Sequence, residues 1–237
     1  MYGVSAVTAV TAQNTTGVSE IHPIPADIVR AQIDRVAQDV EIAAVKTGML
    51  ATPDIVRAVA ESISRLGLRN VVVDPVLASG GAGARTLLAP EAVSVLKTLL
   101  LPVAAVVTPN VAEAAALCGV DVNSLDAARE AARRIAGLGA GAVVIKGGHL
   151  RGPQAIDLLF HDGVFTELAA PRADIGVIHG TGCTFASAIA AWLADGCGVA
   201  TSVERAKRYV TGAIEHSFSV GRGARVLNHF WEQPSPR

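Results

Sequence analysis

The sequence contains few aromatic residues, few cysteines and no excess of charge of either sign. Aromatic residues fill 4% of the 237 positions, and the formal net charge at pH 7 is −1. A near-neutral chain lacks the basic surface that nucleic-acid binding requires, so we expect no nucleic-acid partner. The three cysteines, Cys118, Cys183 and Cys197, stand at no metal-ligand spacing. Their odd number, together with the absence of a secretory signal, favours a reducing compartment and predicts a cytoplasmic protein.

Targeting segments and long hydrophobic runs are absent as well. Residues 1–17 contain neither a basic stretch nor a long apolar run, so we do not interpret them as a targeting segment. The longest run without charged residues, around 175–194, is interrupted by glycines. A membrane span needs about 20 consecutive apolar residues, so none is expected.

Aliphatic residues are abundant instead. Hydrophobic residues make up 51% of the chain and charged residues 17%, which allows a large buried core. A core of this kind is typical of parallel strands that are covered by helices on both faces. The length fits one α/β domain over residues 1–237.

Short apolar runs alternate with helical patterns along the chain. Hydrophobic periodicity and capping residues predict strands at 4–11, 43–45, 70–74, 104–107 and 141–145, a hairpin at 156–168, and helices at 25–39, 53–66, 90–100, 111–118, 124–138, 185–194 and 203–218. The Asp162-Gly163 pair is a typical hairpin turn.

Polar segments follow the expected buried strands. Ligands of open α/β sheets bind outside the carboxyl ends of the strands, so these segments should lie on one rim. They contain lysine, aspartate, threonine and asparagine, and occupy 46–49, 74–75, 108–110 and 146–149. We predict a phosphate-handling cleft at this rim.

The turn His-Gly-Thr-Gly-Cys-Thr precedes the expected apolar helix at 185–194. Gly180 and Gly182 allow a ligand to approach the backbone closely, and free N–H groups at a helix start bind anions. Thr181 adds a hydroxyl, and the helix start is expected to lower the pKa of the Cys183 thiol. The alternative is a tight turn that only caps a buried helix.

Two pairs of polar residues are candidates for a nucleotide site. Asn110 and Glu113, three positions apart at a helix start, suit a hydrated Mg²⁺ bound to a nucleotide, although they could equally form a helix cap. Asp74 ends a buried strand and needs a partner or a chemical role. Lys146, beside two glycines, suits a phosphate but could be a solvated rim residue.

Gln13 and Met49 are candidates for an organic pocket, in which the amide contacts a heterocycle edge and the thioether packs on its face. Ordinary turn and core packing is the alternative for each. The chain contains no P-loop motif. Phe185 stands where a dinucleotide fingerprint needs glycine or alanine, which disfavours a Rossmann oxidoreductase.

Seven stretches in this order resemble the bacterial hydroxymethylpyrimidine/phosphomethylpyrimidine kinases of the ribokinase-like superfamily. They are TAVTAQNT (8–15), KTGML (46–50), VVVDPV (71–76), TPNVAEAAAL (108–117), VIKGGH (144–149), HGTGCT (179–184) and GRGARVLNHF (221–230). The resemblance implies a three-layer αβα sandwich with a mostly parallel sheet. It also implies ATP- and Mg²⁺-dependent phosphorylation of a small pyrimidine alcohol and its monophosphate in thiamine biosynthesis, by a homodimer.

The resemblance also implies roles for individual residues. Pyrimidine-contacting positions correspond to Gln13, Met49 and Val76. The Mg²⁺–phosphate region corresponds to Asp74 and Glu113, and the nucleotide site to Asn110, Lys146 and Thr181. The anion hole corresponds to Gly180, Thr181, Gly182 and Cys183. Cysteine at the last of these positions, where related sugar kinases carry aspartate, is typical of the pyrimidine kinases; it could accept the substrate proton or position the acceptor.

The chain departs from the family pattern at its beginning. The family usually opens with a strand, a glycine-rich loop and a helix, and residue 1 here corresponds to a point just before the second strand. Two alternatives therefore stay open beside the pyrimidine kinase. One is a pyridoxal kinase of the same fold, and the other is a catalytically silent ligand-binding protein.

Overall fold

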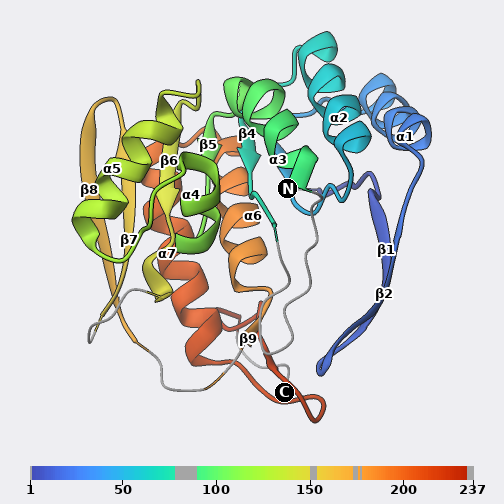
Figure 1. Cartoon of the computed structure of the whole chain (residues 1–237). Helices are drawn as coiled ribbons and strands as arrows, with labels where there is room; N and C mark the ends of the chain where they lie inside the picture. The colour runs from blue at the N-terminus through green and yellow to red at the C-terminus, as the bar shows by residue number, and fades with distance from the viewer. Residues whose placement is uncertain (1, 78–89, 150–153, 173–175, 177, 234–237) are drawn as a thin grey trace.

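The computed structural model describes residues 2–77, 90–149, 154–172, 176 and 178–233 (Figure 1). A mixed six-stranded sheet, in the order β3-β4-β5-β6-β7-β8, forms its centre. The strands are β3 (Val45–Thr47), β4 (Val71–Val73), β5 (Val106–Val107), β6 (Ala142–Ile145), β7 (Gln154–His161) and β8 (Val164–Pro171). Strands β3 to β6 pair in parallel with one another. Strand β7 pairs antiparallel with both β6 and β8, and the expected mostly parallel sheet is confirmed.

Helices cover both faces of this sheet (Figure 1). They are α1 (Ala26–Asp39), α2 (Pro53–Leu66), α3 (Pro90–Val95), α4 (Val111–Cys118), α5 (Leu125–Ala136), α6 (Thr181–Ala194) and α7 (Val199–Glu215). Alternate residues of each strand point to opposite faces. Val71 and Val73 accordingly join the core beneath α1–α5, whereas Val72 joins the core beneath α6 and α7. This is the expected αβα sandwich.

Local capping signals set several of the helix boundaries. The Thr52 hydroxyl accepts a hydrogen bond from the N–H of Ile55 at 3.3 Å, and Pro53 opens α2. Gly67 ends α2 with φ at +62°, a conformation that glycine adopts without a Cβ clash. At the β7–β8 turn, Asp162 and Gly163 both have positive φ, as predicted for a hairpin.

The N-terminal part differs from the sequence prediction. The strand expected at 4–11 is β1 (Ala9–Asn14), which pairs with the unforeseen antiparallel strand β2 (Gly17–Pro23). This hairpin stands apart from the central sheet (Figure 1). Its turn accepts the C-terminal segment, because the N–H of Ala224 donates to the carbonyl of Thr15 at 2.8 Å.

Smaller differences occur at other boundaries. The strand expected at 43–45 is shifted to β3, because its hydrogen bonds are set by pairing with β4. The helix expected at 90–100 changes into the π-helical turn η1 (Leu96–Leu100), followed by the 3₁₀ turn η2 (Leu101–Val103). Two further short strands, β9 (Ile178–His179) and β10 (Arg225–Val226), pair in parallel, and β9 directly precedes α6 in the chain. Residues 78–89, between β4 and α3, lie outside the described residues.

Candidate active site

The carboxyl ends of the parallel strands meet the start of α6, as the sequence predicted. The carboxylate of Asp74 directly follows β4, and Lys146 directly follows β6. The Lys146 ammonium lies 2.8 Å from Oδ1 of Asp74 and 3.7 Å from Oε2 of Glu113. Lys146 keeps 17% of its side chain exposed. It is therefore a paired lysine within the cleft and not a solvated rim residue.

The surrounding backbone fixes this charge cluster. The N–H of Lys146 donates to the carbonyl of Pro109 at 2.8 Å, and the N–H of Asp74 donates to the carbonyl of Thr47 at 3.1 Å. The Thr108 hydroxyl donates to Oδ1 of Asp74 at 3.3 Å. Asp74 and Lys146 are therefore each held to a neighbouring strand end.

Glu113 and Asn110 form a complete capping box at the start of α4. The Asn110 side chain accepts from the N–H of Glu113 at 2.9 Å, and the Glu113 carboxylate accepts from the N–H of Asn110 at 2.8 Å. The structural alternative considered for this pair is therefore present. Glu113 also faces Lys146. One carboxylate thus caps the helix and contributes to the charge cluster.

Burial and ion pairing shift the pKa values of this cluster. Burial raises the pKa of Glu113 above its usual value, against the opposing effects of Lys146 and the Asn110 N–H. Burial alone would lower the pKa of Lys146, but the carboxylates of Asp74 and Glu113 outweigh it and the pKa is raised. Lys146 therefore stays charged at neutral pH.

The start of α6 closes the other side of the cluster. Gly180 occupies the N-cap position with φ at +86° and provides no side-chain cap, so the N–H groups of the first turn remain for a ligand. A Cβ at Gly182 would lie 3.0 Å from Nζ of Lys146 and 3.9 Å from Oδ2 of Asp74. Glycine at this position therefore allows the helix start to approach the ion pair.

Cys183 follows in the first turn of α6 and is exposed to the adjoining cavity. The prediction of a lowered thiol pKa was wrong. Desolvation by the cavity walls raises the pKa of Cys183; the ammonium of Lys46 opposes this shift, and the Asp74 carboxylate adds to it. The thiol is therefore protonated at neutral pH.

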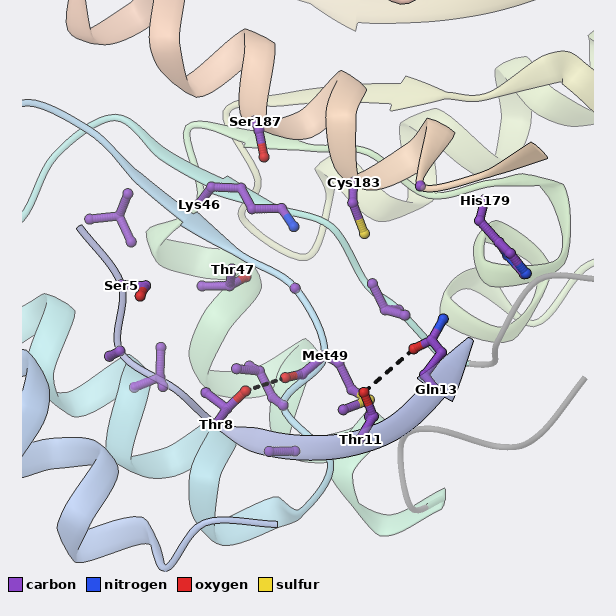
Figure 2. A pocket seen from close by; sticks show the side chains of 18 of the residues that line it. Ser5, Thr8, Thr11, Gln13, Lys46, Thr47, Met49, His179, Cys183 and Ser187 are labelled. Atoms are coloured by element: carbon purple, nitrogen blue, oxygen red, sulfur yellow. Dashed lines mark hydrogen bonds between the residues drawn. The ribbon is translucent and has the colours of Figure 1, made fainter. Parts of the chain in front are cut away.

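A cavity of about 1230 Å³ extends from Cys183 toward the β1–β2 hairpin. Gln13, Met49 and Val76 all line it, so the three residues expected to contact the heterocycle lie around one cavity. Figure 2 shows Gln13 and Met49 on the side of the β1 strand. The Thr8 hydroxyl donates to the carbonyl of Met49 at 2.6 Å and ties the N-terminal segment to the end of β3. The hairpin thus forms one wall of the cavity.

Two residues of β3, Lys46 and Thr47, belong to this cavity; the sequence placed both on the predicted phosphate-handling rim without separate roles. Figure 2 shows the side chain of Lys46 extending into it toward Cys183. Thr47 also lines the cavity, and its buried hydroxyl has no hydrogen-bond partner among the described residues. Both residues were expected in the loop after a strand at 43–45, and the structure places them in β3 itself.

Asp157 of β7 is a second feature that the sequence did not reveal. Its Oδ1 accepts the N–H of Gly147 at 2.9 Å, and its Oδ2 accepts from the Lys207 ammonium at 2.9 Å. Lys207, on α7, also donates to the carbonyl of Ala155 at 3.2 Å. This buried pair fixes the backbone directly after Lys146.

The residues present fit a nucleotide-bound magnesium ion. The hydrogen bonds of Asp74 with Lys146 and with Thr108 both use Oδ1, and Oδ2 faces the start of α6. Mg²⁺ is usually held by one or two carboxylates, with phosphates and waters completing its shell. Within the described ranges, no three His, Cys, Asp or Glu side chains converge as a metal cluster. Two carboxylates, those of Asp74 and Glu113, suit the way in which Mg²⁺ is held together with a nucleotide.

Among the described residues, no helix has both the length and the apolar character that crossing a membrane requires.

Comparison with known proteins gives a consistent family match. The family model described as phosphomethylpyrimidine kinase matches residues 1–228. The hydroxymethylpyrimidine/phosphomethylpyrimidine kinase of Bacillus subtilis is 44% identical over 232 residues, covering 97% of this chain and 84% of the relative. The thiamine biosynthesis bifunctional protein ThiED of Geobacter sulfurreducens is 47% identical over 229 residues, covering 96% of this chain. The chain spans 46% of that longer protein.

Solved structures with the same architecture include both a pyridoxal kinase and a phosphomethylpyrimidine kinase. An ADP complex of Bacillus subtilis pyridoxal kinase has a TM-score of 0.90 at 36% identity, covering 98% of this chain and 88% of that chain. A phosphomethylpyrimidine kinase from Clostridium difficile has a TM-score of 0.78 at 35% identity, covering 90% of this chain and 87% of that chain. The expected ribokinase-like architecture is confirmed.

Proposed function

This chain belongs to the phosphomethylpyrimidine kinase family, and we propose on that premise that it phosphorylates 4-amino-5-hydroxymethyl-2-methylpyrimidine and its monophosphate with ATP. The product is the diphosphate that thiamine biosynthesis uses. One observation carries the proposal. The ion pair of Lys146 and Asp74 faces the uncapped start of α6, and the cavity that holds Gln13 and Met49 opens beside them.

The nucleotide phosphates are proposed to bind at the carboxyl ends of β5 and β6. Lys146 provides a charged ammonium, Asn110 a nearby amide, and Thr181 a hydroxyl at the start of α6. Asp74 and Glu113 are proposed to hold Mg²⁺, which would neutralise charge on the nucleotide phosphates when bound. The raised pKa of Lys146 supports a permanently charged contact for phosphate.

Phosphoryl transfer depends mainly on positioning and on charge stabilisation. The N–H groups from Gly180 to Cys183 are proposed to receive the equatorial oxygens of the transferred group. The acceptor oxygen forms a bond to the γ-phosphorus, the bond to the bridging oxygen of ADP breaks, and the acceptor proton is released. Because the pKa of Cys183 is raised, we favour a role in which the thiol positions the acceptor over one as a preformed base.

The organic part of the acceptor is proposed to lie in the cavity. The Gln13 amide offers a donor and an acceptor to the edge of a heterocycle. Met49 and Val76 provide apolar contacts for its faces. The aminopyrimidine has both a polar edge and apolar faces, as these three residues require.

A coupled assay of ADP release, with products identified by mass spectrometry, tests this function. We expect ADP formation that depends on the pyrimidine alcohol or on its monophosphate, with the pyrimidine diphosphate as final product. Absence of both phosphorylated products at saturating Mg·ATP would contradict it. Binding of the pyrimidine without any consumption of ATP would instead support the catalytically silent ligand-binding protein.

The pyridoxal kinase alternative rests on one specific observation, the high structural similarity to the Bacillus subtilis enzyme. Both substrates present a hydroxymethyl group on a nitrogen heterocycle. Values of kcat/KM for pyridoxal and for the pyrimidine alcohol, measured on one preparation, distinguish the two. We expect the pyrimidine to be preferred, because the sequence identity to pyrimidine kinases is higher.

Two further properties are proposed from the sequence resemblance and composition. The family resemblance supports a homodimer, which light scattering at micromolar concentration tests. The three cysteines are free in the described structure, which supports a cytoplasmic protein.

A further inference from the structure

Lys46 is a cation of the cavity that no described carboxylate neutralises. Lys146 is engaged by Asp74 and Glu113, and Lys207 is engaged by Asp157. Lys46 makes neither a hydrogen bond nor an ion pair with any residue in the described ranges, and its ammonium extends toward Cys183 (Figure 2). Arg225 also lines the cavity, but it donates to the hydroxyl and the carbonyl of Ser217. Among the described lysines and arginines of the lining, Lys46 is therefore the one whose charged end has no hydrogen-bond partner.

The backbone leaves room for this ammonium at one place. A Cβ on Gly48 would lie 2.9 Å from Nζ of Lys46. The lysine side chain therefore folds back over the end of β3 into space that only glycine leaves free. This arrangement directs the charge into the cavity and not into solvent outside it.

The cavity wall contains a second polar residue directly after Lys46 in β3. Thr47 is 5% exposed and lines the cavity, and its buried Oγ1 has no partner among the described residues. The ammonium of Lys46 is the group that reaches the cavity, and an unpaired ammonium suits an anion with several acceptor oxygens, such as a phosphate.

The two proposed acceptors differ in charge at this position. The alcohol is uncharged, whereas a phosphate monoester carries about −1.5 to −2 charges at pH 7. Transfer to the monophosphate brings this charge close to the transferred γ-phosphate. Because Lys146 is already paired, a further cation is needed for the second acceptor and not for the first.

We propose that Lys46 binds the phosphate of the monophosphorylated acceptor and makes the second phosphorylation possible. The inference rests on the proposed function, because it assigns a subsite of that same cavity. Lys46 lies beside the Cys183 thiol, where the acceptor oxygen is proposed to be held. The side chain is therefore expected to determine the preference between the two acceptors.

The test compares the wild type with Lys46→Met, Lys46→Arg, Gly48→Ala and the control Lys97→Met. For each protein, kcat/KM is measured with the pyrimidine alcohol and with its monophosphate. The Kd of the monophosphate is measured by calorimetry without nucleotide. Lys97, in η1, is a lysine outside the cavity lining.

Lys46→Met is expected to lower the ratio of monophosphate to alcohol kcat/KM by about 10- to 100-fold, as loss of a charged hydrogen bond implies. It is expected to raise the Kd of the monophosphate by a similar factor. Lys46→Arg, which keeps the charge, should restore most of the ratio. Gly48→Ala should lower it partially by displacing the ammonium, and Lys97→Met should not change it.

An unchanged ratio and Kd in Lys46→Met, or an equal fall in Lys97→Met, would overturn the inference. If the wild type phosphorylates neither acceptor, the proposed function fails, and the calorimetric Kd alone decides about Lys46. A wild type that binds no monophosphate would overturn both. A folded Lys46→Arg protein with the ratio of Lys46→Met would also contradict a role for the charge.

Discussion

The ammonium of Lys146 lies 2.8 Å from Oδ1 of Asp74, and a Cβ at Gly182 would lie 3.0 Å from the same ammonium. Two strand ends and a helix start therefore meet at one ion pair. These two contacts link residues that are far apart in the sequence and place them where the proposed phosphoryl transfer occurs.

Removal of one partner of this pair should cost both stability and activity. Asp74→Ala leaves Lys146 facing Glu113 alone and is expected to lower the free energy of unfolding by about 2–4 kcal/mol, as for a partly buried ion pair. In a double-mutant cycle with Lys146→Ala, the two losses should not add, because the residues interact directly. Denaturant unfolding measures each step, and additive losses would contradict the pairing.

Gly182→Ala is expected to lower the activity of the protein without lowering its stability. Alanine favours a helix by up to about 1 kcal/mol over glycine, so stability should be kept or rise. The new Cβ displaces the Lys146 ammonium, and kcat/KM for ATP should fall by about 10- to 100-fold. Gly198→Ala at the start of α7, where a Cβ meets nothing within 4 Å, is the matched control. Equal activity in both variants would refute the proposed role of the close approach.

The thiol of Cys183 should react as a neutral group at physiological pH. Its pKa is raised above the usual 9.0, so the thiolate forms only as the pH rises through that higher value. In a Cys118→Ser/Cys197→Ser background, the pH midpoint of iodoacetamide alkylation at Cys183 is expected above 9. Lys46→Met should move this midpoint further upward, because the ammonium opposes the shift. A midpoint below pH 8 would contradict the raised pKa and would support a thiolate base at Cys183, as the helix start alone predicts.

Asp157 is expected to act as a positioning residue for the backbone after Lys146. Asp157→Asn weakens the hydrogen bond to the Gly147 N–H and leaves Lys207 without its charge partner. We expect the KM for ATP to rise by about 5- to 20-fold, with a smaller change in kcat, because one hydrogen bond to a charged group is lost. Asp162→Asn, at the exposed β7–β8 turn, is the control. A fall in kcat alone would indicate a different role for Asp157.

Local signals in the sequence were sufficient for many elements. Thr52, Pro53 and Gly67 predicted both ends of α2, and Asp162-Gly163 predicted the β7–β8 turn, because these residues act on their own backbone. The second strand of the β1–β2 hairpin was missed, because the apolar residues of β2, Val18 and Ile21, do not alternate with polar residues as in a typical strand.

The candidate site was predictable to a similar extent. The rule that strand ends share one rim brought Asp74 and Lys146 together correctly. The direction of the Lys46 side chain and the hydrogen bonds of Asp157 depend on tertiary packing, which the spacing of residues does not encode. The pKa of Cys183 was mispredicted because desolvation by burial and the nearby Asp74 carboxylate raise it, which the sequence does not show.

The most direct test of the central claim follows the labelled phosphoryl group from γ-³²P-ATP to the pyrimidine alcohol. The wild type should transfer the label to the pyrimidine. Cys183→Ala and Asp74→Ala should remain folded, as judged by circular dichroism, and transfer it at least about 100-fold more slowly, as expected when positioning and charge stabilisation are lost. Full turnover in either folded variant, or no label on the pyrimidine with the wild type, would contradict the account.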